Sequence, residues 1–482
     1  MKKKYIITSA LLYGCCILFS ALAFAGNITV KGKVVSNGKG IALVQVTDGT
    51  NIVETNKKGA FSMEVQSQNE YVYYTLPSGY ESPIEKGIPV FFQKIDPGLK
   101  KQEIDFEIKK SEKSQLIHKF ILWADPQVLE LSEFDQLEEV VADVNKTIAS
   151  FPQDIPVHAI CAGDNVFDQL NFFDKYKQVI SQIKVPFYHV IGNHDMDYNN
   201  RSNEFSAKSY SAAFGPTHFS YNVGKIHYVV LKDVFYYGYS YRYIGYIDEL
   251  QLQWLEKDLQ FVKPGSTVVV SLHIPTIYGE SGKADSYSTT LSNSVMNCPA
   301  LYKVLSPYKA HILAGHSHTQ WFTQVAPNIS EHVHAAACGA WWQGEICTDG
   351  SPKAYTVYEV NGDSLTWYFK GVNQSKEEQF KLYKTGTDNK YPECFIANVY
   401  NYDPLWKIYW YENGIIKGEM TQYWGEDPDA AELYQPGKNK KHSWLSVSET
   451  HHLFRARPEN PNTTISVEVV DRFGRKFCKY LH

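Results

Sequence analysis

The chain has 482 residues, of which 44% are hydrophobic and 21% are charged, as is usual for a globular protein. At roughly 150 residues per domain, this length is enough for about three domains. The formal net charge of −5 argues against a polybasic surface, so we expect no nucleic-acid partner and disfavour a nuclease.

Residues 1–25 have the pattern of a signal peptide. Three lysines at 2–4 precede a largely apolar stretch at 5–24, and residues 23–25 fit a small-x-small cleavage site. Removing the three lysines would bring the net charge to −8, because this stretch contains no acid. No later stretch is long and apolar enough to span a bilayer. We therefore expect an exported protein, periplasmic, cell-surface or secreted, without a transmembrane span after processing. An uncleaved anchor and lipoprotein processing before Cys15 are the alternatives.

Residues 26–110 are expected to form a small β-sandwich domain. Apolar and polar residues alternate in short runs, and turn signals such as Asn37-Gly38 and Asp48-Gly49 separate them. The spacing of Thr55, Gly59 and Phe61 resembles that of transthyretin-like or carboxypeptidase-regulatory-like domains. This region contains no catalytic constellation.

Between residues 115 and 348, five strand-like runs each end in polar residues. The runs at 117–124, 157–162, 187–191, 267–272 and 311–314 lead into Asp125-Pro126-Gln127, Gly163-Asp164, Gly192-Asn193-His194-Asp195, His273 and Gly315-His316-Ser317-His318. In open α/β sheets the carboxyl ends of the strands line one crevice. The side chains of Asp, Asn, Gln and His are common metal ligands. The pattern therefore predicts a single crevice lined with metal ligands.

The same region alternates between strands and helices. Apolar residues recur at helical spacing over 133–149, 171–183 and 248–261, and such stripes face a core. Two further strands, at 218–223 and 226–231, form a predicted hairpin. Residues 350–482 return to strand-like segments at 355–360, 364–369, 407–412 and 464–470, which predict a third, β-rich domain.

The five motifs, in this order, resemble those of the calcineurin-like metallophosphoesterases, which read D-x-H, G-D, G-N-H-[DE], H and G-H-x-H. One such motif would be weak evidence, but five in order over residues 117–345 are specific. The resemblance implies an α/β fold, with a central four-layer metallophosphoesterase β-sandwich flanked by helices. It also implies the exported bacterial type, with small β-sandwich domains on both sides.

The resemblance further implies two divalent metal ions with seven protein ligands and a bridging hydroxide as the nucleophile. Asp164 would bridge the ions, the first would take Asp125, Gln127 and His318, and the second would take Asn193, His273 and His316. Two such ions clamp the phosphate oxygens and activate water. Oxygen and imidazole ligands suit Mn, Fe, Zn, Mg or Co, and the sequence does not choose among them. His316 and His318 alternate, and we expect Gly315 to allow the turn that brings both to the metals.

Gln127 departs from the family pattern, in which most members have His. An amide oxygen is a weaker ligand than imidazole for zinc or iron, so the first ion is expected to bind less tightly or to be Mn²⁺ or Mg²⁺. Gln127 could instead lie behind the ligands. Asp-Pro-Gln does occur in a subgroup that includes a protein phosphatase, so the change does not imply a dead enzyme.

His194 matches the residue that acts as general acid in the family, donating a proton to the leaving-group oxygen. A carboxylate behind it would fix its ring. Asp168 resembles this partner, although it lies one residue further along than in the family, and Asp195 and Asp197 are rivals.

The expected function is metal-dependent hydrolysis of phosphate esters on a small molecule or a protein, with monoesters favoured over diesters. The alternative is a catalytically weak surface protein that uses its outer β domains to bind glycans or partner proteins. Trp341, Trp342, Tyr243, Tyr246 and Tyr278 could border the crevice or pack between domains. The phosphate could contact Lys232 or Arg242. Cys338 and Cys347 are near enough in sequence to form a disulfide, whereas His332 and His334 are expected in the core or on the surface.

Overall fold

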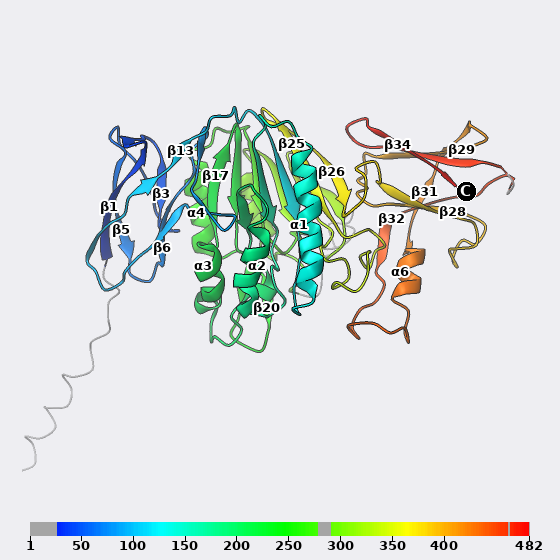
Figure 1. Cartoon of the computed structure of the whole chain (residues 1–482), viewed down its shortest axis with the longest axis horizontal. Helices are drawn as coiled ribbons and strands as arrows, with labels where there is room; N and C mark the ends of the chain where they lie inside the picture. The colour runs from blue at the N-terminus through cyan, green and yellow to red at the C-terminus, as the bar shows by residue number, and fades with distance from the viewer. Residues whose placement is uncertain (1–26, 278–290, 461–462, 482) are drawn as a thin grey trace, which may run out of the picture.

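A computed structural model describes residues 27–277, 291–460 and 463–481. The predicted signal peptide and Tyr278 lie outside these residues. The chain forms three parts in a row, with β-rich parts at both ends of a central part that carries most of the helices (Figure 1). None of the helices in the described ranges is long and apolar enough to cross a membrane.

The N-terminal part consists of two small β-sheets and short ribbons. Its strands are β1 (Asn27–Ser36), β2 (Lys39–Gly40), β3 (Gln45–Thr47), β4 (Ile52–Glu54), β5 (Ala60–Gln66), β6 (Tyr71–Tyr74), β7 (Tyr80–Glu81), β8 (Ile84–Glu85), β9 (Ile88–Pro89), β10 (Phe92–Lys94), β11 (Lys101–Glu103), β12 (Phe106–Glu107) and β13 (Lys109–Lys110). β1 pairs with β2, β5, β11 and β12, and the second sheet has the order β10-β6-β3-β4. Alternate residues of β1, such as Val30 and Val34, are buried, so one face of each sheet supplies the core.

The central part contains a five-stranded and a six-stranded sheet. The first has the order β16 (Phe187–His189), β15 (Val157–Cys161), β14 (Ile117–Trp123), β25 (Ala354–Asn361) and β26 (Ser364–Gly371). The second has the order β17 (Phe219–Val223), β18 (Ile226–Val230), β21 (Thr267–Ser271), β22 (Lys309–Ala314), β24 (Ile329–Val333) and β23 (Trp321–Ala326). A short ribbon, β19 (Val234–Tyr236) and β20 (Tyr243–Gly245), follows β18. Phe120 of the first sheet packs on Tyr228 of the second, so the sheets share a core.

Helices cover the outer faces of the two sheets. They are α1 (Glu133–Ala149), α2 (Phe173–Ile180), α3 (Lys208–Phe214), α4 (Glu249–Leu259) and α5 (Cys298–Leu305). Thr147 of α1 hydrogen-bonds to Tyr355 of the first sheet, and Asp258 of α4 to His227 of the second. The predicted four-layer α/β architecture, with β-rich parts on both sides, is confirmed.

β25 and β26 differ from the sequence expectation, which grouped residues 355–360 and 364–369 with the third domain. β25 pairs antiparallel with β14, with Tyr358 opposite Phe120, and β26 follows as the edge strand. The local pattern identifies a strand but not its partner, because pairing depends on residues more than two hundred positions away.

The C-terminal part is a second β-sandwich. Its strands are β27 (Phe380–Tyr383), β28 (Phe395–Val399), β29 (Lys407–Glu412), β30 (Ile415–Glu419), β31 (Thr421–Glu426), β32 (Glu449–Ala456), β33 (Ile465–Val470) and β34 (Lys476–Leu481), with α6 (Pro428–Leu433) after β31. The sheets have the orders β27-β28-β32-β31 and β30-β29-β33-β34. Phe395 and Val467 belong to the apolar cluster between them.

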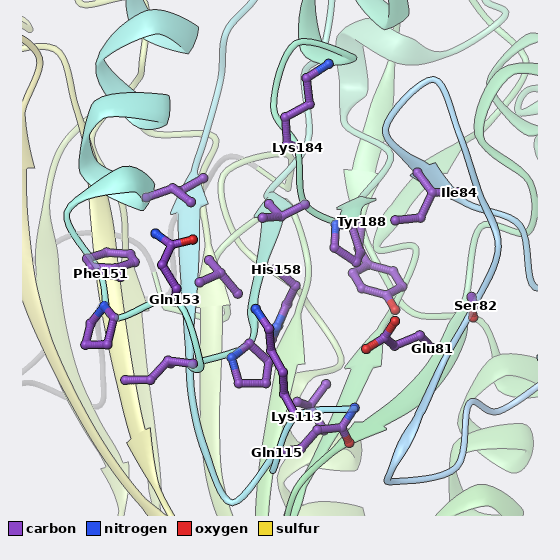
Figure 2. Close-up of a pocket in the computed structure, with 18 of the residues that line it drawn as sticks. Glu81, Ser82, Ile84, Lys113, Gln115, Phe151, Gln153, His158, Lys184 and Tyr188 are labelled. Atoms are coloured by element: carbon purple, nitrogen blue, oxygen red, sulfur yellow. The ribbon is translucent and has the colours of Figure 1, made fainter. Parts of the chain in front are cut away.

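A cavity of about 780 Å³ lies between the N-terminal and central parts (Figure 2). Tyr80, Phe151, His158 and Tyr188 are among its lining residues. Its lining includes Val157 and Pro186, at the starts of β15 and β16, whereas the polar motifs follow the ends of these strands. The cavity therefore lies apart from the motif residues.

Candidate metal centre

The five sequence motifs meet at one end of the central sandwich, because the strands that precede them run in the same direction within each sheet. β14, β15 and β16 are parallel, as are β21 and β22. The side chains of Asp125, Asp164 and His273 are almost completely buried there. The side chains predicted to line one crevice therefore form a compact polar group in the loops that follow these strands.

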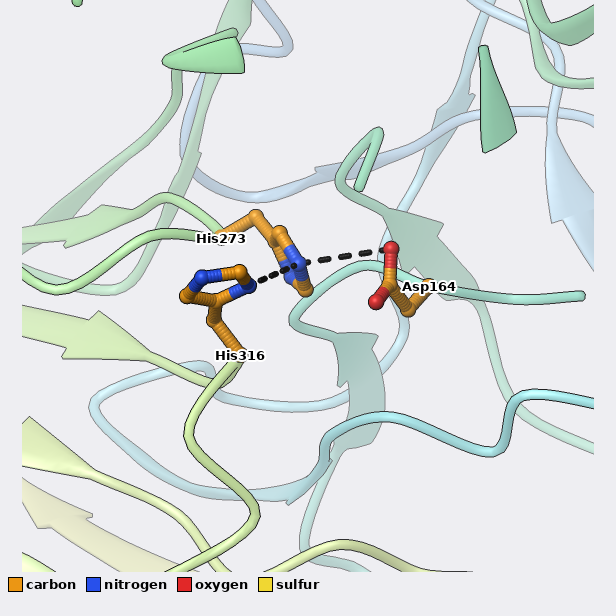
Figure 3. A group of neighbouring side chains, drawn as sticks. All are labelled: Asp164, His273 and His316. Carbon is orange, nitrogen blue, oxygen red and sulfur yellow. Dashed lines mark hydrogen bonds and ion pairs between the residues drawn. The ribbon is translucent and has the colours of Figure 1, made fainter. Parts of the chain in front are cut away.

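Asp164, His273 and His316 form the centre of this group. One ligand atom from each lies within 4.8 Å of the other two. His273 Nε2 lies 3.3 Å from Asp164 Oδ1 and 3.3 Å from His316 Nδ1, and its ring lies between these two side chains (Figure 3). The three residues come from loops after three different strands, so the fold creates this cluster.

The ring of His273 has a fixed orientation. Its Nδ1 lies 2.8 Å from the carbonyl oxygen of Ala162, and its Nε2 lies 3.0 Å from Asn193 Oδ1. A histidine whose Nδ1 is held by a backbone carbonyl presents Nε2 as the ligand atom. Asn193 Oδ1, Asp164 Oδ1 and His316 Nδ1 all lie within 3.3 Å of His273 Nε2, so four possible metal-ligand atoms meet there.

Asp125, Gln127 and His318 form the adjoining half of the group. His318 Nε2 lies 3.6 Å from Asp125 Oδ1, and Gln127 Nε2 donates to Asp164 Oδ2 at 2.7 Å. Gln127 Oε1 is buried and has no hydrogen-bond partner among the described residues. A buried polar oxygen without a partner is costly, and a cation at this point would satisfy it.

The pKa values at the site reflect its buried charge. Burial raises the pKa of Asp125 to about 8. Burial lowers the pKa of His273, but the charges of Asp164, Asp125 and Asp233 and the contact with Asp164 together raise that pKa to about 10. Burial lowers the pKa of His316 and His318 to about 3, so both imidazoles are neutral and keep a lone pair for a metal. Buried acids beside the neutral imidazoles of His316 and His318 fit divalent cations, and a bound cation would displace the proton of His273.

His194 lies beside this group and contacts Asp168. Its Nδ1 is 3.0 Å from Asp168 Oδ1, which leaves Nε2 as the other ring nitrogen. Burial lowers the pKa of His194, whereas Asp164 and Asp168 raise it, and the net pKa lies above the ordinary value. Asp195 accepts the backbone N–H groups of Gly192, Asn165 and Val166, and Asp197 accepts that of Ser209. Of the three carboxylates considered from the sequence, Asp168 is therefore the one that contacts His194.

Three family models match the chain in succession. The N terminal of calcineurin-like phosphoesterase matches residues 28–111, calcineurin-like phosphoesterase matches 117–320, and the C terminal of calcineurin-like phosphoesterase matches 331–477. The chain belongs to the calcineurin-like phosphoesterase family. It is a metallophosphoesterase that hydrolyses phosphate esters, and the dimetal phosphatases of this family use divalent metals. The predicted family and enzyme class are confirmed.

Solved structures show more distant likenesses. A dimetal phosphatase from Danio rerio is 14% identical, with 53% of this chain and 96% of that chain covered at a TM-score of 0.38. A purple acid phosphatase from yellow lupin (Lupinus luteus) seeds is 13% identical, with 69% and 68% covered at a TM-score of 0.40. No curated protein matched the chain.

Left-handed backbone is concentrated at the site of this phosphoesterase. Eight non-glycine residues with φ between 40° and 69° lie there, namely Asp125, Gln127, Asp164, Asp168, His316, His318, Trp341 and Trp342. This conformation is unfavourable for residues with a Cβ, and such strain concentrates at functional sites. His316 and His318 themselves adopt it, whereas Gly315 does not. The left-handed backbone of the turn is therefore in the two histidines, not in Gly315.

The motif glycines are required because there is no room for a Cβ atom at these positions. A Cβ on Gly315 would lie 2.6 Å from Asp125 Oδ2, and a Cβ on Gly192 would lie 2.1 Å from Asp164 Oδ1. Both distances are too short for non-bonded atoms. The carboxylates occupy the volume that any other residue would fill.

Asp233 also contributes to the site, although the sequence analysis did not identify it. Its carboxylate accepts the backbone N–H groups of His273 at 3.2 Å and Ile274 at 2.7 Å, which holds the loop after β21. The available signal was its position three residues beyond β18, at the same edge of the sheet as the motifs.

The other candidates have mixed outcomes. The ring of Tyr243 meets that of His316 edge-on, with centroids 6.2 Å apart, and the ring of Trp341 lies against that of His318, with centroids 4.4 Å apart. Both aromatic residues therefore border the site. Trp342 packs behind it, donating to the carbonyl of Pro126, and Tyr246 packs on Phe235. Lys232 donates to Asn203, and Arg242 lies over Tyr239.

Two cysteines and two histidines considered from the sequence lie in the interior. Cys338 and Cys347 are free buried thiols, so the possible disulfide is not formed. The thiol of each faces a carbonyl oxygen, Cys338 that of Gly339 and Cys347 that of Ala336. His332 and His334 are buried and both contact the hydroxyl of Tyr358, in agreement with a core role.

Proposed function

We propose that this phosphoesterase hydrolyses phosphate monoesters, including phosphorylated proteins, in preference to diesters, with His194 as general acid. The observation that supports this best is the convergence of seven ligand-type side chains beside the His194–Asp168 pair. The preference for monoesters rests on the Asp125-Pro126-Gln127 motif, which resembles that of a subgroup containing a protein phosphatase.

Two divalent ions would be held by these seven side chains. Asp164 lies between the two halves and would contact both ions. Asp125, Gln127 and His318 would hold one, and the remaining three, Asn193, His273 and His316, would hold the other. When bound, the ions would supply positive charge to the phosphate oxygens and lower the pKa of a water molecule.

His194 would complete the reaction. Asp168 holds Nδ1 and keeps the ring in one orientation, so Nε2 can donate a proton. Water forms a new bond to phosphorus, the bond from phosphorus to the ester oxygen breaks, and the leaving oxygen takes the proton of His194. The products are an alcohol and inorganic phosphate.

The test is hydrolysis of a chromogenic phosphomonoester and the matching diester by protein without residues 1–25, after loading with Mn²⁺, Mg²⁺, Zn²⁺ or Fe²⁺. We expect metal-dependent turnover that Asp164→Asn abolishes. His194→Ala should lower turnover of an alkyl phosphate, whose leaving alkoxide needs a proton, more than that of the chromogenic ester. Asp174→Asn on α2, whose carboxylate is 89% exposed, is the matched control and should keep full activity. Absence of turnover with every metal in a folded protein would refute the proposal and favour the glycan- or protein-binding alternative.

Export rests on the leader pattern of residues 1–25. In a bacterial host we expect the full-length protein to lose this segment and to fractionate outside the cytoplasm. Mass spectrometry of the N-terminus would distinguish cleavage before Gly26 from lipoprotein processing or an uncleaved anchor.

A further inference from the structure

Four nearly parallel aromatic rings lie in a row that begins beside the metal centre; the last of them, His442, is buried, and Trp444 is exposed. Phe167 stacks on His194 with ring centroids 3.9 Å apart and planes 19° apart. Trp444 follows Phe167 at 6.4 Å and 16°, and His442 lies against Trp444 at 4.6 Å and 15°. Trp341 meets Phe167 edge-on at 6.3 Å. The rings therefore form a continuous aromatic surface that begins at the proposed general acid.

Trp444 is the exposed part of this surface and comes from the C-terminal part of the chain. It is 56% exposed, although burying a Trp side chain would normally stabilise a protein. The segment that carries it, between α6 and β32, runs back toward the central part (Figure 1). A large aromatic side chain is thus left exposed next to Phe167, which stacks on the proposed general acid of a different domain.

Contacts on both sides hold this segment in place. Before Trp444, the hydroxyl of Tyr434 donates to the carbonyl of Ile346 at 2.8 Å, and Lys441 pairs with the buried Glu133. After it, Ser448 N donates to the carbonyl of Thr348 at 2.9 Å.

The adjacent residue gives a further anchor. Leu445 is buried in an apolar cluster with Ala340 and Tyr434, and Trp341 packs against this cluster. Trp444 is therefore positioned by structure on both sides, and its exposure is not the result of a loose loop.

We propose that Trp444 is a specificity-determining residue that stacks on a planar aromatic ring in the leaving group of the substrate. This inference rests on the proposed function, because the leaving group must lie next to His194 to receive its proton. A ring joined to the ester oxygen directly or through a few bonds would then reach the aromatic surface. Stacking of aromatic rings contributes to binding beyond the area that it buries. The sources of such a ring are an aryl or arylalkyl phosphate, phosphotyrosine included, and a nucleotide.

The test compares esters whose leaving alcohols have the same chemistry but differ in the ring. Benzyl phosphate is paired with butyl phosphate, and adenosine 5′-monophosphate with ribose 5-phosphate. We expect Trp444→Ala to lower the kcat/KM ratio of the ring-bearing to the ringless ester by about 3- to 10-fold, the range typical of an aromatic pair. Trp444→Phe keeps a ring and should retain most of the ratio. Tyr480→Ala is the control, because Tyr480 is a 61% exposed aromatic residue of the same domain.

The results also separate the two sources of the ring. If Trp444→Ala lowers the kcat/KM ratio only for the benzyl and butyl esters, the ring belongs to an aryl or arylalkyl leaving group. If it lowers the ratio only for the adenosine and ribose esters, the ring belongs to a nucleotide. An unchanged ratio for both pairs in Trp444→Ala would overturn the inference, as would an equal fall in Tyr480→Ala.

Binding of benzylphosphonate and butylphosphonate, measured by calorimetry, tests the inference without turnover. If no ester is hydrolysed, the proposed function fails, but a preference for benzylphosphonate that Trp444→Ala removes would still support the aromatic site. Equal affinity of the wild type for the two phosphonates would overturn it.

Discussion

Replacing Asp168 with Asn tests whether the carboxylate beside His194 helps His194 to donate a proton to the leaving group. Asp168 has a left-handed backbone with φ of 59°, a conformation that Asn tolerates better than most residues, so the loop should keep its shape. The substitution exchanges one carboxylate oxygen for an amide nitrogen and removes the charge that stabilises protonated His194. The structural change is therefore small and the electrostatic change is large.

The size of the effect follows from the geometry. Asp168 Oδ1 lies 3.0 Å from His194 Nδ1, and the two side chains are 26% and 22% exposed. A hydrogen bond to a charged group contributes about 1.5–3 kcal/mol, and partial exposure favours the lower half of this range. A loss of about 2 kcal/mol of transition-state stabilisation corresponds to a decrease in kcat of roughly 30-fold.

The assay is the dependence of kcat on the leaving group in a series from alkyl to nitrophenyl phosphates. Alkoxide leaving groups require a proton, so alkyl esters should lose the full factor, whereas nitrophenolate leaves without one and should lose about 3-fold or less. Asp197→Asn is the matched control, because Asp197 binds Ser209 and should show no dependence on the leaving group. Equal losses for all esters in Asp168→Asn would refute the role assigned to this pair.

Three further predictions concern the scaffold. Gly315→Ala would place a Cβ 2.6 Å from Asp125 Oδ2, so we expect a loss of about 1–3 kcal/mol in thermal unfolding and a lower bound-metal content by elemental analysis. Tyr358→Phe removes the partner of one ring nitrogen in each of two buried imidazoles, His332 and His334, and urea unfolding should show a loss of about 2–4 kcal/mol with kcat unchanged. Burial raises the pKa of Glu331 from 4.5 to about 7, so the folded state binds more protons between these values. Stability should therefore fall by about 3 kcal/mol as pH rises from 4.5 to 7, and Glu331→Gln should flatten this part of the urea-unfolding profile.

Regular elements with a strong local pattern could be predicted from the sequence. The expected helix at 133–149 is α1, because its apolar stripe of Leu137, Val140 and Val144 faces the sheet. The helix expected at 248–261 is α4, which begins after Asp248, whose carboxylate accepts the N–H of Gln251. The expected hairpin is formed by β17 and β18. These features depend on neighbours in the chain, so the local pattern was sufficient.

The parts that could not be predicted depend on distant contacts. The pairing of β25 with β14 and the turn made by His316 and His318 both follow from residues that fold against them. In the turn, His316 N donates to Asp125 Oδ2 at 2.9 Å, a contact across 191 positions. Trp444 lies 250 positions from His194 and belongs to no motif. The motifs indicated the residues of the candidate site, whereas its aromatic rim required the three-dimensional arrangement.

The eight left-handed residues at the site lower the stability of the folded protein, although their side chains belong to the proposed reaction site. Each costs of order 1 kcal/mol relative to a relaxed backbone, and glycine would remove most of that cost. A selection of variants for heat resistance alone would therefore favour glycine at these positions and remove the proposed metal ligands, the partner of the proposed general acid or the aromatic residues beside them as stability increased. Laboratory evolution of this phosphoesterase needs an activity screen at every round, because the most accessible stabilising substitutions lie within its catalytic centre.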